Sequence, residues 1–445
     1  MPGLFGTDGI RGVANAELTP EFTVGLGRAV VRTLREEGRA RPHIVVGRDP
    51  RASGEMLEAA LVAGITSAGG DVTAVGVLPT PAVAFLTVGL GADSGAMISA
   101  SHNPVADNGI KFFGHDGYKL TDAEEDRVEE LLQRLYSDRP VGVDIGRLRE
   151  RHDLLDRYVD HLASTVAEPL DGLRVVIDCA NGSASPVGPT LLKRLGCDVI
   201  AINASPDGLN INDGCGSTYP DVVAAAVVEH GADIGLTHDG DADRLIAADH
   251  TGNVVDGDTI LAILAQRLHR ETGLRSVVTT VMTNMGFKQA MRGMGIDVVE
   301  TKVGDRYVLE AMRAGGHPIG GEQSGHVILL EHSTSGDGVL TAVQLLEALA
   351  VAKQPLAELA TVMRRLPQVL VNVAQVDRER LKGAAAIWQA VADEERALDG
   401  SGRVLVRASG TEPLVRVMVE ADSQERANEV AQRLAKVCAT ELALG

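Results

Sequence analysis

The sequence predicts an α/β protein of several domains, and three observations support this fold class. A chain of 445 residues is too long for one hydrophobic core. Strand and helix signals alternate over most of its length, which predicts parallel sheets joined by crossover helices. Near the C-terminus three alternating strands and two helices predict a smaller α+β domain. We expect three similar α/β domains and one α+β domain, over residues 1–155, 156–254, 255–367 and 368–445.

The first domain carries clear local signals. Its expected strands cover 43–46, 72–77 and 95–98, and its expected helices cover 20–38, 55–67 and 121–135. Thr121 and Glu124 form a capping box at the start of the last of these helices. Residues 72–92 carry no charge, but glycines and prolines interrupt them. We therefore expect a strand, a turn and a helix with Thr80 as its N-cap, rather than a membrane span.

The pattern of strand, glycine-containing turn and helix begins again near Leu173 and again near Asp256. These restarts are the reason for expecting similar domains. In the second and third domains, strands are predicted over 173–178, 198–204, 233–238 and 276–281, and helices over 221–230 and 258–270. In the last domain, strands are predicted over 369–373, 403–407 and 415–419, and helices over 379–396 and 423–441.

Composition narrows the class of partner. The net charge of −19 argues against a nucleic-acid partner, although a few converging arginines could still bind a phosphorylated small molecule. The four cysteines form no CxxC pair, which is typical of a reduced cytoplasmic protein. The N-terminus has no basic stretch followed by an apolar one, so we expect no signal peptide and no membrane association. The sequence leaves open whether the protein is a monomer or a homodimer.

The segment Ser99–Pro104 is the first candidate for chemistry. It follows the apolar strand over 95–98, and the dipeptide Asn103-Pro104 stops regular structure there. We expect the hydroxyl of Ser101 to be displayed on a tight loop, with the imidazole of His102 beside it. Lys111 follows closely in the chain and could reach the same place.

Three aspartates in five residues, Asp239, Asp241 and Asp243, follow the predicted strand over 233–238. Carboxylates crowded in this way need a counter-charge, and oxygen ligands favour Mg²⁺ over zinc. An EF-hand is excluded because its loop would need glycine and glutamate where Arg244 and His250 stand. A haloacid-dehalogenase-type phosphatase, with Asp239 as nucleophile, is the weaker alternative. A phosphate on Ser101 would be a natural fourth ligand of the cation.

Two further polar loops could bind a phosphorylated sugar. Residues 320–326 lie between apolar stretches, and their Glu322, Gln323 and Ser324 side chains can bond sugar hydroxyls. Residues 407–413 leave a strand and offer backbone N–H groups, hydroxyls and a guanidinium, which together resemble a phosphate nest. Arg416 could add a second positive charge there.

These motifs together resemble the α-D-phosphohexomutase family over the whole chain and in the same order. The resemblance also covers the opening segment Phe5–Gly12. It implies four domains around a central cleft, a phosphorylated catalytic serine and one Mg²⁺ ion. By this resemblance the phosphoserine is Ser101, and the metal ligands are its phosphate, Asp239, Asp241 and Asp243. The expected substrate-binding and electrostatic or proton-transfer residues are Glu322, Gln323, Ser324, His326, Arg407, Ser409, Gly410, Thr411, Arg416, Arg11, His102 and Lys111.

The resemblance further implies an isomerase that moves a phosphoryl group between two positions of one sugar. Gln323 and the opening segment are similar to family members that act on glucosamine phosphates. Phospho-Ser101 would donate to O1 of glucosamine 6-phosphate, and Ser101 would then take the 6-phosphoryl group from the bisphosphate intermediate. A glucosamine 1,6-bisphosphate or a similar compound would act as activator. A mutase for glucose or mannose phosphates, and a non-catalytic phosphosugar sensor, remain alternatives.

Overall fold

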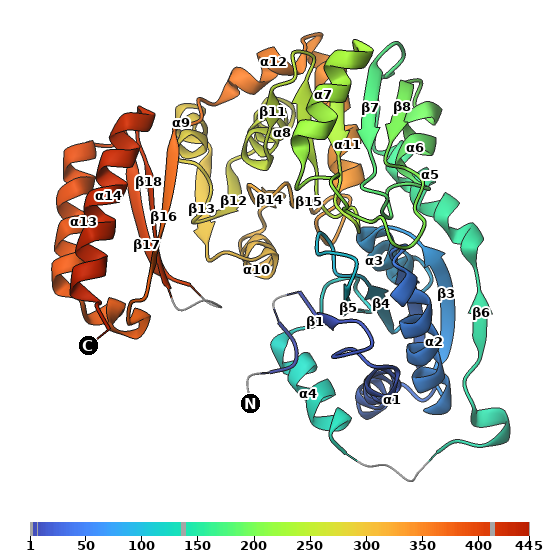
Figure 1. Ribbon diagram of the computed structural model, residues 1–445. Helices are drawn as coiled ribbons and strands as arrows, with labels where there is room; N and C mark the ends of the chain where they lie inside the picture. The colour runs from blue at the N-terminus through green and yellow to red at the C-terminus, as the bar shows by residue number, and fades with distance from the viewer. Residues whose placement is uncertain (1–2, 7, 135–138, 410–413, 445) are drawn as a thin grey trace. The chain divides into compact units, whose positions relative to one another are not determined.

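The computed structural model describes residues 3–6, 8–134, 139–409 and 414–444 (Figure 1). The chain forms two compact units. Unit 1 comprises Met1–Met282 and Ile296–Val362, and unit 2 comprises Thr283–Gly295 and Met363–Gly445. Unit 1 contains three β-sheets and unit 2 contains one. The fold class predicted from the sequence, with three α/β sheets followed by an α+β part, is confirmed.

The first sheet of unit 1 has six strands in the order β1-β5-β4-β2-β3-β6. The strands are β1 (Ile10–Val13), β2 (His43–Arg48), β3 (Asp71–Val77), β4 (Ser94–Ile98), β5 (Asp107–Gly114) and β6 (Leu148–Glu150). The helices are α1 (Pro20–Glu36), α2 (Ala52–Ser67), α3 (Thr80–Gly89) and α4 (Asp122–Leu132). Strand side chains alternate between faces, so Val46 and Ala96 pack in the core with α1, α2 and α4, whereas Gly47 and Gly95 face α3.

Two helix starts predicted in the first domain can be compared with the structure, and one of them is confirmed. The capping box is confirmed, because the Thr121 side chain accepts from the Glu124 N–H and the Glu124 side chain accepts from the Thr121 N–H. The prediction that Thr80 caps α3 is wrong. Pro79 occupies the cap position, and Thr80 is the first helical residue. Thr80 is held by a long-range contact instead: its hydroxyl donates to the buried carboxylate of Asp241 at 2.6 Å, and its N–H donates to the Asp241 carbonyl.

The second sheet has the order β11-β10-β9-β7-β8. Its strands are β7 (Arg174–Asp178), β8 (Asp198–Ile202), β9 (Ile234–Thr237), β10 (Ile246–Asp249) and β11 (Val254–Val255). The helices of this part are α5 (Leu155–Ser164), α6 (Gly188–Arg194) and α7 (Pro220–His230). Strands β7, β8 and β9 are parallel, and β9 ends directly before the aspartate loop that begins at His238.

The third sheet has the order β13-β12-β14-β15. Its strands are β12 (Ser276–Thr280), β13 (Asp297–Thr301), β14 (Ile319–Gly321) and β15 (Val327–Leu329). The helices are α8 (Gly257–Thr272), α10 (Asp305–Gly315), α11 (Gly338–Ala352) and α12 (Leu356–Leu359). Strands β14 and β15 form a hairpin, so the polar segment 322–326 is its turn.

No single helix in the described part of the chain is long and apolar enough to cross a bilayer. Helix α11 reaches the length and composition of a membrane span only together with residues 356–362, from which it is bent by 93°.

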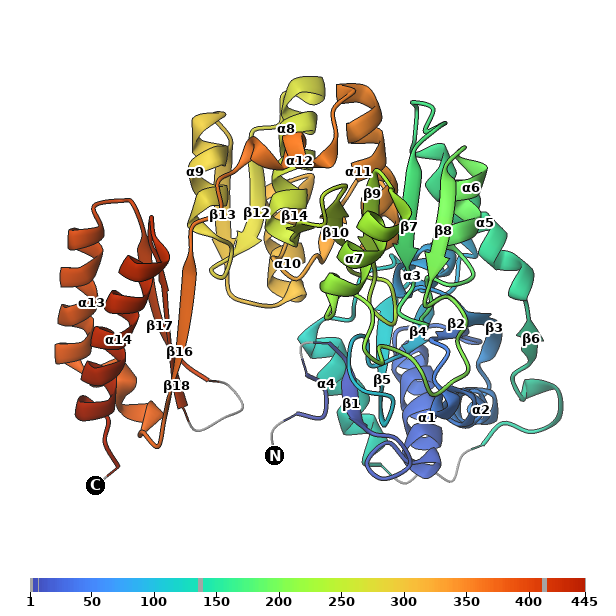
Figure 2. The ribbon, with the colours of Figure 1, turned by 45° about the horizontal axis from the view of Figure 1, so that its top comes forward.

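Unit 2 is built on an antiparallel sheet in the order β16-β18-β17. The strands are β16 (Gln368–Ala374), β17 (Arg403–Ala408) and β18 (Leu414–Glu420), and the helices are α13 (Ala385–Leu398) and α14 (Gln424–Glu441). Figures 1 and 2 show both helices on the same face of this sheet. The single helix expected over 379–396 is a 3₁₀ turn (Arg378–Gly383) followed by α13, with glycine, a weak helix former, at the break.

Helix α9 (Met285–Gly293) also belongs to unit 2, although it lies within residues 255–367, assigned by the sequence to the third domain. The buried Glu420 explains this grouping. Its carboxylate accepts from the Met285 N–H at 2.8 Å and from the Asn284 amide at 3.3 Å. The same carboxylate pairs with Arg403 at 2.7 Å. A buried charge held by several donors fixes α9 firmly to the C-terminal sheet.

Candidate active site

Ser101 lies on a tightly bonded loop at the end of β4. The Ser99 hydroxyl donates to Asp49 at 2.7 Å and accepts from the Ser101 N–H at 2.9 Å. Ser101 is 1% exposed and has a φ of 52°, a left-handed conformation that is unusual for serine. Its hydroxyl donates to Asp239 Oδ2 at 2.5 Å and lies 3.2 Å from His102 Nδ1. The serine loop and the aspartate loop, which are 138 residues apart in the chain, therefore meet.

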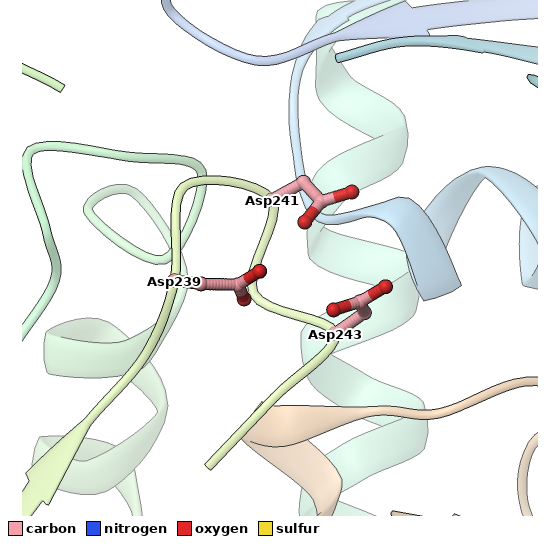
Figure 3. Close-up of side chains that lie close together, drawn as sticks. All are labelled: Asp239, Asp241 and Asp243. Carbon is pink, nitrogen blue, oxygen red and sulfur yellow. The ribbon is translucent and has the colours of Figure 1, made fainter. Parts of the chain in front are cut away.

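The three aspartates after β9 form a compact oxygen cluster (Figure 3). Asp239, Asp241 and Asp243 are all buried, and one carboxylate oxygen from each can be chosen so that all three lie within 4.8 Å of one another. The Oδ1 atom of each is buried and accepts no hydrogen bond from any residue that the structure describes. Three converging, unsatisfied carboxylate oxygens fit a hard divalent cation, so this cluster could hold a metal ion.

Asp241 shows why one oxygen of the cluster stays available. Its Oδ2 accepts from Lys111 Nζ at 2.9 Å and from Thr80 Oγ1 at 2.6 Å, whereas its Oδ1 has no hydrogen-bond partner among the described residues. Burial raises the pKa of Asp241, but the charge of Lys111 and the hydrogen bonds from Thr80 and Lys111 together outweigh burial, so the net pKa is lowered. Burial likewise lowers the pKa of Lys111, but Asp241 and Asp8 outweigh it, so the net pKa is raised and the ammonium stays charged.

The other two carboxylates are less well compensated by the protein. Burial raises the pKa of Asp239, and the neighbouring charges of Asp243 and Asp241 raise it further. Burial also raises the pKa of Asp243, with Asp241 adding to the effect. Both shifts report negative charge that is crowded in a water-poor place, which a bound cation would relieve.

A network of charges surrounds this cluster, and the sequence analysis missed part of it. Asp8 accepts from Lys119 at 2.6 Å and from Lys111 at 3.4 Å, and it also pairs with Arg11. Lys119 in turn pairs with Asp305 at the start of α10. Arg11 donates to Asn103 of the serine loop at 3.3 Å. The opening segment containing Asp8 was singled out, but Lys119 has no local signal.

The hairpin turn after β14 brings the predicted sugar-binding residues to the same part of unit 1. His326 Nε2 lies 3.9 Å from Asp243 and 3.8 Å from Asp305. Glu322 accepts from the Gly304 N–H at 3.1 Å. The buried Ser324 Oγ and His326 Nδ1 have no hydrogen-bond partner within the described chain. These two atoms remain available to a ligand.

Gln323 of the same turn is held differently. Its side-chain amide donates to Asp256 at 3.4 Å, and its carbonyl accepts from the Gly257 N–H at the start of α8 at 3.1 Å. The structure thus connects Gln323 to α8, whereas Glu322 contacts the loop that precedes α10.

The remaining predicted residues lie in unit 2. Arg407 and Arg416 are directly opposite each other on β17 and β18. Burial lowers the pKa of Arg407, and the charge of Arg416 lowers it further. Like charges in a cross-strand pair are unfavourable unless an anion lies between them. Ser409 is buried, and its carbonyl accepts from Arg378 at 2.6 Å, a third arginine that the sequence analysis did not select. Gly410 and Thr411 lie outside the described residues.

Comparisons with known proteins agree over the whole chain. Models of the phosphoglucomutase/phosphomannomutase family match in four parts: alpha/beta/alpha domain I at residues 2–139, domain II at 156–252, domain III at 256–366 and the C-terminal domain at 370–437. The phosphoglucosamine mutase of Streptomyces coelicolor is 57% identical over 444 residues and is matched over 98% of both chains. That of Thermobifida fusca is 56% identical, with 100% of both chains covered.

Solved structures have the same fold. A phosphoglucomutase/phosphomannomutase family protein from Burkholderia thailandensis superposes with a TM-score of 0.82 at 26% identity, over 98% of this chain and 97% of the other. The N-acetylphosphoglucosamine mutase of Aspergillus fumigatus, solved in complex with GlcNAc-6P and magnesium, superposes with a TM-score of 0.67 at 18% identity, over 99% and 96% of the two chains. With four domain models in order and relatives more than half identical over their full length, the chain belongs to the phosphoglucomutase/phosphomannomutase family of α-D-phosphohexomutases.

Proposed function

We propose that this enzyme interconverts glucosamine 6-phosphate and glucosamine 1-phosphate, with Ser101 as the residue that carries the phosphoryl group. The hydrogen bond of 2.5 Å between Ser101 Oγ and Asp239 is the observation that supports this role most strongly. A buried serine hydroxyl beside three unsatisfied carboxylate oxygens has little use in stability. A phosphate on that hydroxyl, together with a cation on the carboxylates, would complete the site.

In the proposed reaction the bond between phosphorus and Ser101 Oγ breaks while a bond forms to a free hydroxyl oxygen of the sugar. In this first transfer the sugar hydroxyl loses its proton and the released Ser101 oxygen takes one up. In the second transfer the other phosphorus–oxygen bond of the bisphosphate breaks, Ser101 Oγ gives up its proton as it is phosphorylated again, and the freed sugar oxygen takes a proton up. His326 is the proposed proton carrier, because its Nδ1 is buried and unpartnered among the described residues. Lys111 stays charged beside Asp241 and offsets the negative charge of the transferring group.

Asp239, Asp241 and Asp243 are the proposed ligands of one Mg²⁺ ion, with an oxygen of phospho-Ser101 as a further ligand. When bound, such an ion withdraws charge from the phosphoryl oxygens and so lowers the barrier to transfer. The all-oxygen donor set favours Mg²⁺ over zinc.

Each unit carries residues that we propose bind a part of the substrate. Glu322 and Ser324 bind sugar hydroxyls, and the arginine pair Arg407 and Arg416, with Ser409, binds the phosphate that does not react. Two arginines at paired positions of neighbouring strands offer guanidinium groups of the kind that bind phosphate. Glucosamine is the proposed sugar because the relatives at 56–57% identity are phosphoglucosamine mutases. The four cysteines are free and buried, which suits a reducing compartment, and we propose the cytoplasm.

The test combines mass and activity. The purified protein, treated with a hexose 1,6-bisphosphate, should gain the mass of one phosphate, and peptide mapping should locate it on Ser101. With Mg²⁺ it should convert glucosamine 6-phosphate with a higher kcat/KM than glucose or mannose 6-phosphate. Ser101→Ala should lose both the phosphate and turnover, while Ser164→Ala, an exposed serine on α5, should keep both. Turnover by Ser101→Ala, or phosphate on another residue, would contradict the proposal.

A further inference from the structure

We infer that Asn212 is a positioning residue that holds the Ser101 loop in register with the aspartate loop. This inference rests on the proposed function, because it assigns to Asn212 the task of aligning the phosphoserine with the cation ligands. Asn212 lies in the loop between β8 and α7, more than 100 residues from Ser101 in the chain, and nothing in its local sequence indicates a role in catalysis.

The carbonyl groups of the serine loop are held from two sides. The Asn212 side-chain amide donates to the carbonyl of Ser101 at 2.9 Å and to that of Asn103 at 3.3 Å. From the first sheet, Arg51 donates to the same two carbonyls, at 2.9 Å each. Arg51 is fully buried and pairs with the equally buried Asp49 at 2.8 Å. One donor thus comes from each of two sheets, and together they fix the backbone at Ser101.

Asn212 is itself held rigidly. Its backbone is left-handed, with a φ of 57°, and its N–H donates to the carbonyl of Ala180 at 2.9 Å. The buried carboxylate of Asp178, at the end of β7, accepts from the N–H groups of Ala180 and Gly216, both at 2.9 Å. It therefore holds the backbone before and after Asn212 in space: at Ala180, which Asn212 bonds, and at Gly216, which follows Asn212 in the chain. The position of the Asn212 amide is therefore determined by the second sheet, which also carries the aspartate loop after β9.

Close packing makes the alignment sensitive to small shifts. A Cβ atom on Gly240 would lie 2.6 Å from the Ser101 carbonyl oxygen and 2.9 Å from Asn212 Nδ2. The serine loop therefore lies directly against the backbone between Asp239 and Asp241. The left-handed conformation of Ser101 is unfavourable for a residue with a side chain and persists only where its surroundings hold it. Asn212 and Arg51 are the side chains that hold it through its carbonyl group.

This arrangement predicts a specific defect when the amide is lost. In the structure Asn212 donates to carbonyl groups and not to Ser101 Oγ or to a carboxylate of the triad. Its removal should let the serine drift from the aspartates while the aspartates keep their own geometry. Phosphorylation of Ser101 should then raise the affinity of the three aspartates for a cation less than it does in the wild type. The affinity without the phosphate should be unchanged.

The experiment measures Mn²⁺ binding by EPR of the free ion, in the full-length protein. Each variant is compared in its phosphorylated form, at an occupancy known from intact mass, and in a Ser101→Ala background. Asn212→Gly keeps the left-handed backbone and removes the amide, and Asn212→Asp keeps the shape and removes the donors. The matched control is Asn210→Asp in the same loop, whose side chain bonds to Ser205 instead of to the serine loop.

We expect phosphorylation to increase Mn²⁺ affinity in the wild type and in Asn210→Asp, and to do so at least threefold less in both Asn212 variants. In the Ser101→Ala background, the affinity for Mn²⁺ should be the same with glycine at position 212 as with the native Asn212. Turnover should fall roughly 10- to 100-fold in kcat with KM for the sugar phosphate within about twofold, because a misplaced reacting group loses rate and not substrate affinity.

Three results would decide against the inference or against its premise. An unchanged effect of phosphorylation on Mn²⁺ binding in both Asn212 variants overturns the positioning role. Failure of both variants to fold cooperatively, seen as loss of the thermal transition, also overturns it, because the amide would then serve folding. A wild-type protein that carries no phosphoserine and turns over no hexose phosphate would instead contradict the proposed function.

Discussion

The Thr80 hydroxyl donates to Asp241 Oδ2 at 2.6 Å and joins the first turn of α3 to the aspartate loop. The backbone repeats the link, because the Thr80 N–H donates to the Asp241 carbonyl at 3.0 Å. The start of α3, which packs on the first sheet, thus supports a carboxylate that follows β9 of the second sheet. The oxygen that Thr80 bonds is Oδ2, which leaves Oδ1 without a hydrogen-bond partner among the described residues.

Thr80→Val should therefore weaken cation binding more than it weakens the fold. Valine keeps the shape but removes the donor, so Oδ2 of Asp241 keeps only Lys111 and the carboxylate can rotate. We expect the affinity for Mg²⁺ to fall roughly 3- to 10-fold, which is less than the full contribution of a hydrogen bond to a charged group because Thr80 orients the carboxylate and does not bind the cation. Calorimetric titration measures it. Thr87→Val, a buried threonine on the same helix whose hydroxyl donates to Val83, is the control and should bind Mg²⁺ like the wild type.

Gly240→Ala should lower both stability and activity. The added methyl group would lie 2.6 Å from the Ser101 carbonyl oxygen, a backbone atom that cannot swing away. We expect a loss of about 1–3 kcal/mol in the free energy of unfolding, measured by urea denaturation, because overpacking forces backbone shifts. Gly293→Ala, at a position with open space, is the control. Equal stabilities of the two variants would show that the loops can move apart freely.

The free energy of unfolding should depend on pH through Asp337. Burial raises the pKa of this carboxyl group from 3.8 to about 6, although it accepts hydrogen bonds from the Leu340 N–H and from the Tyr158 hydroxyl. The folded state thus binds the proton more tightly than the unfolded state. The resulting stabilisation is full below about pH 4 and is lost as the pH rises through about 6.

Asp337→Asn removes this titration and keeps an N-cap that suits α11. Between pH 4 and pH 7, we expect the free energy of unfolding of the variant to rise relative to that of the wild type by about 1–3 kcal/mol. Denaturant titrations at several pH values measure the difference. Asp207→Asn, an exposed turn residue that accepts from the Leu209 N–H, should show no such gain. A difference independent of pH would contradict the prediction.

The arginine pair of unit 2 should report on phosphate binding. Arg416→Gln removes one of two arginines that stand at paired positions of β17 and β18. We expect KM for the sugar phosphate to rise roughly tenfold or more, since a hydrogen bond between charged groups contributes about 1.5–3 kcal/mol. Steady-state kinetics measures it. Arg433→Gln, on the exposed face of α14 beside Glu394, is the control and should leave KM unchanged.

Local patterns predicted most of the secondary structure, and long-range contacts account for the errors. The capping box at Thr121 depends on residues three apart, so the sequence is sufficient to predict it. Thr80 was misassigned because its partner, Asp241, is 161 residues away. The same holds for the site: the aspartate triad is visible as a motif, whereas Asn212, Arg51 and Lys119 gain their roles only from carbonyls and carboxylates brought to them by the fold.

The attachment of α9 to the C-terminal sheet limits how the protein can be divided. A fragment that starts at residue 368 would contain Glu420 and Arg403 but neither Asn284 nor the Met285 N–H, so the buried carboxylate would lose two donors. Unit 2 is therefore not a contiguous piece of the gene product, and the segment Thr283–Gly295 can complete it only after the C-terminal strands have been synthesised.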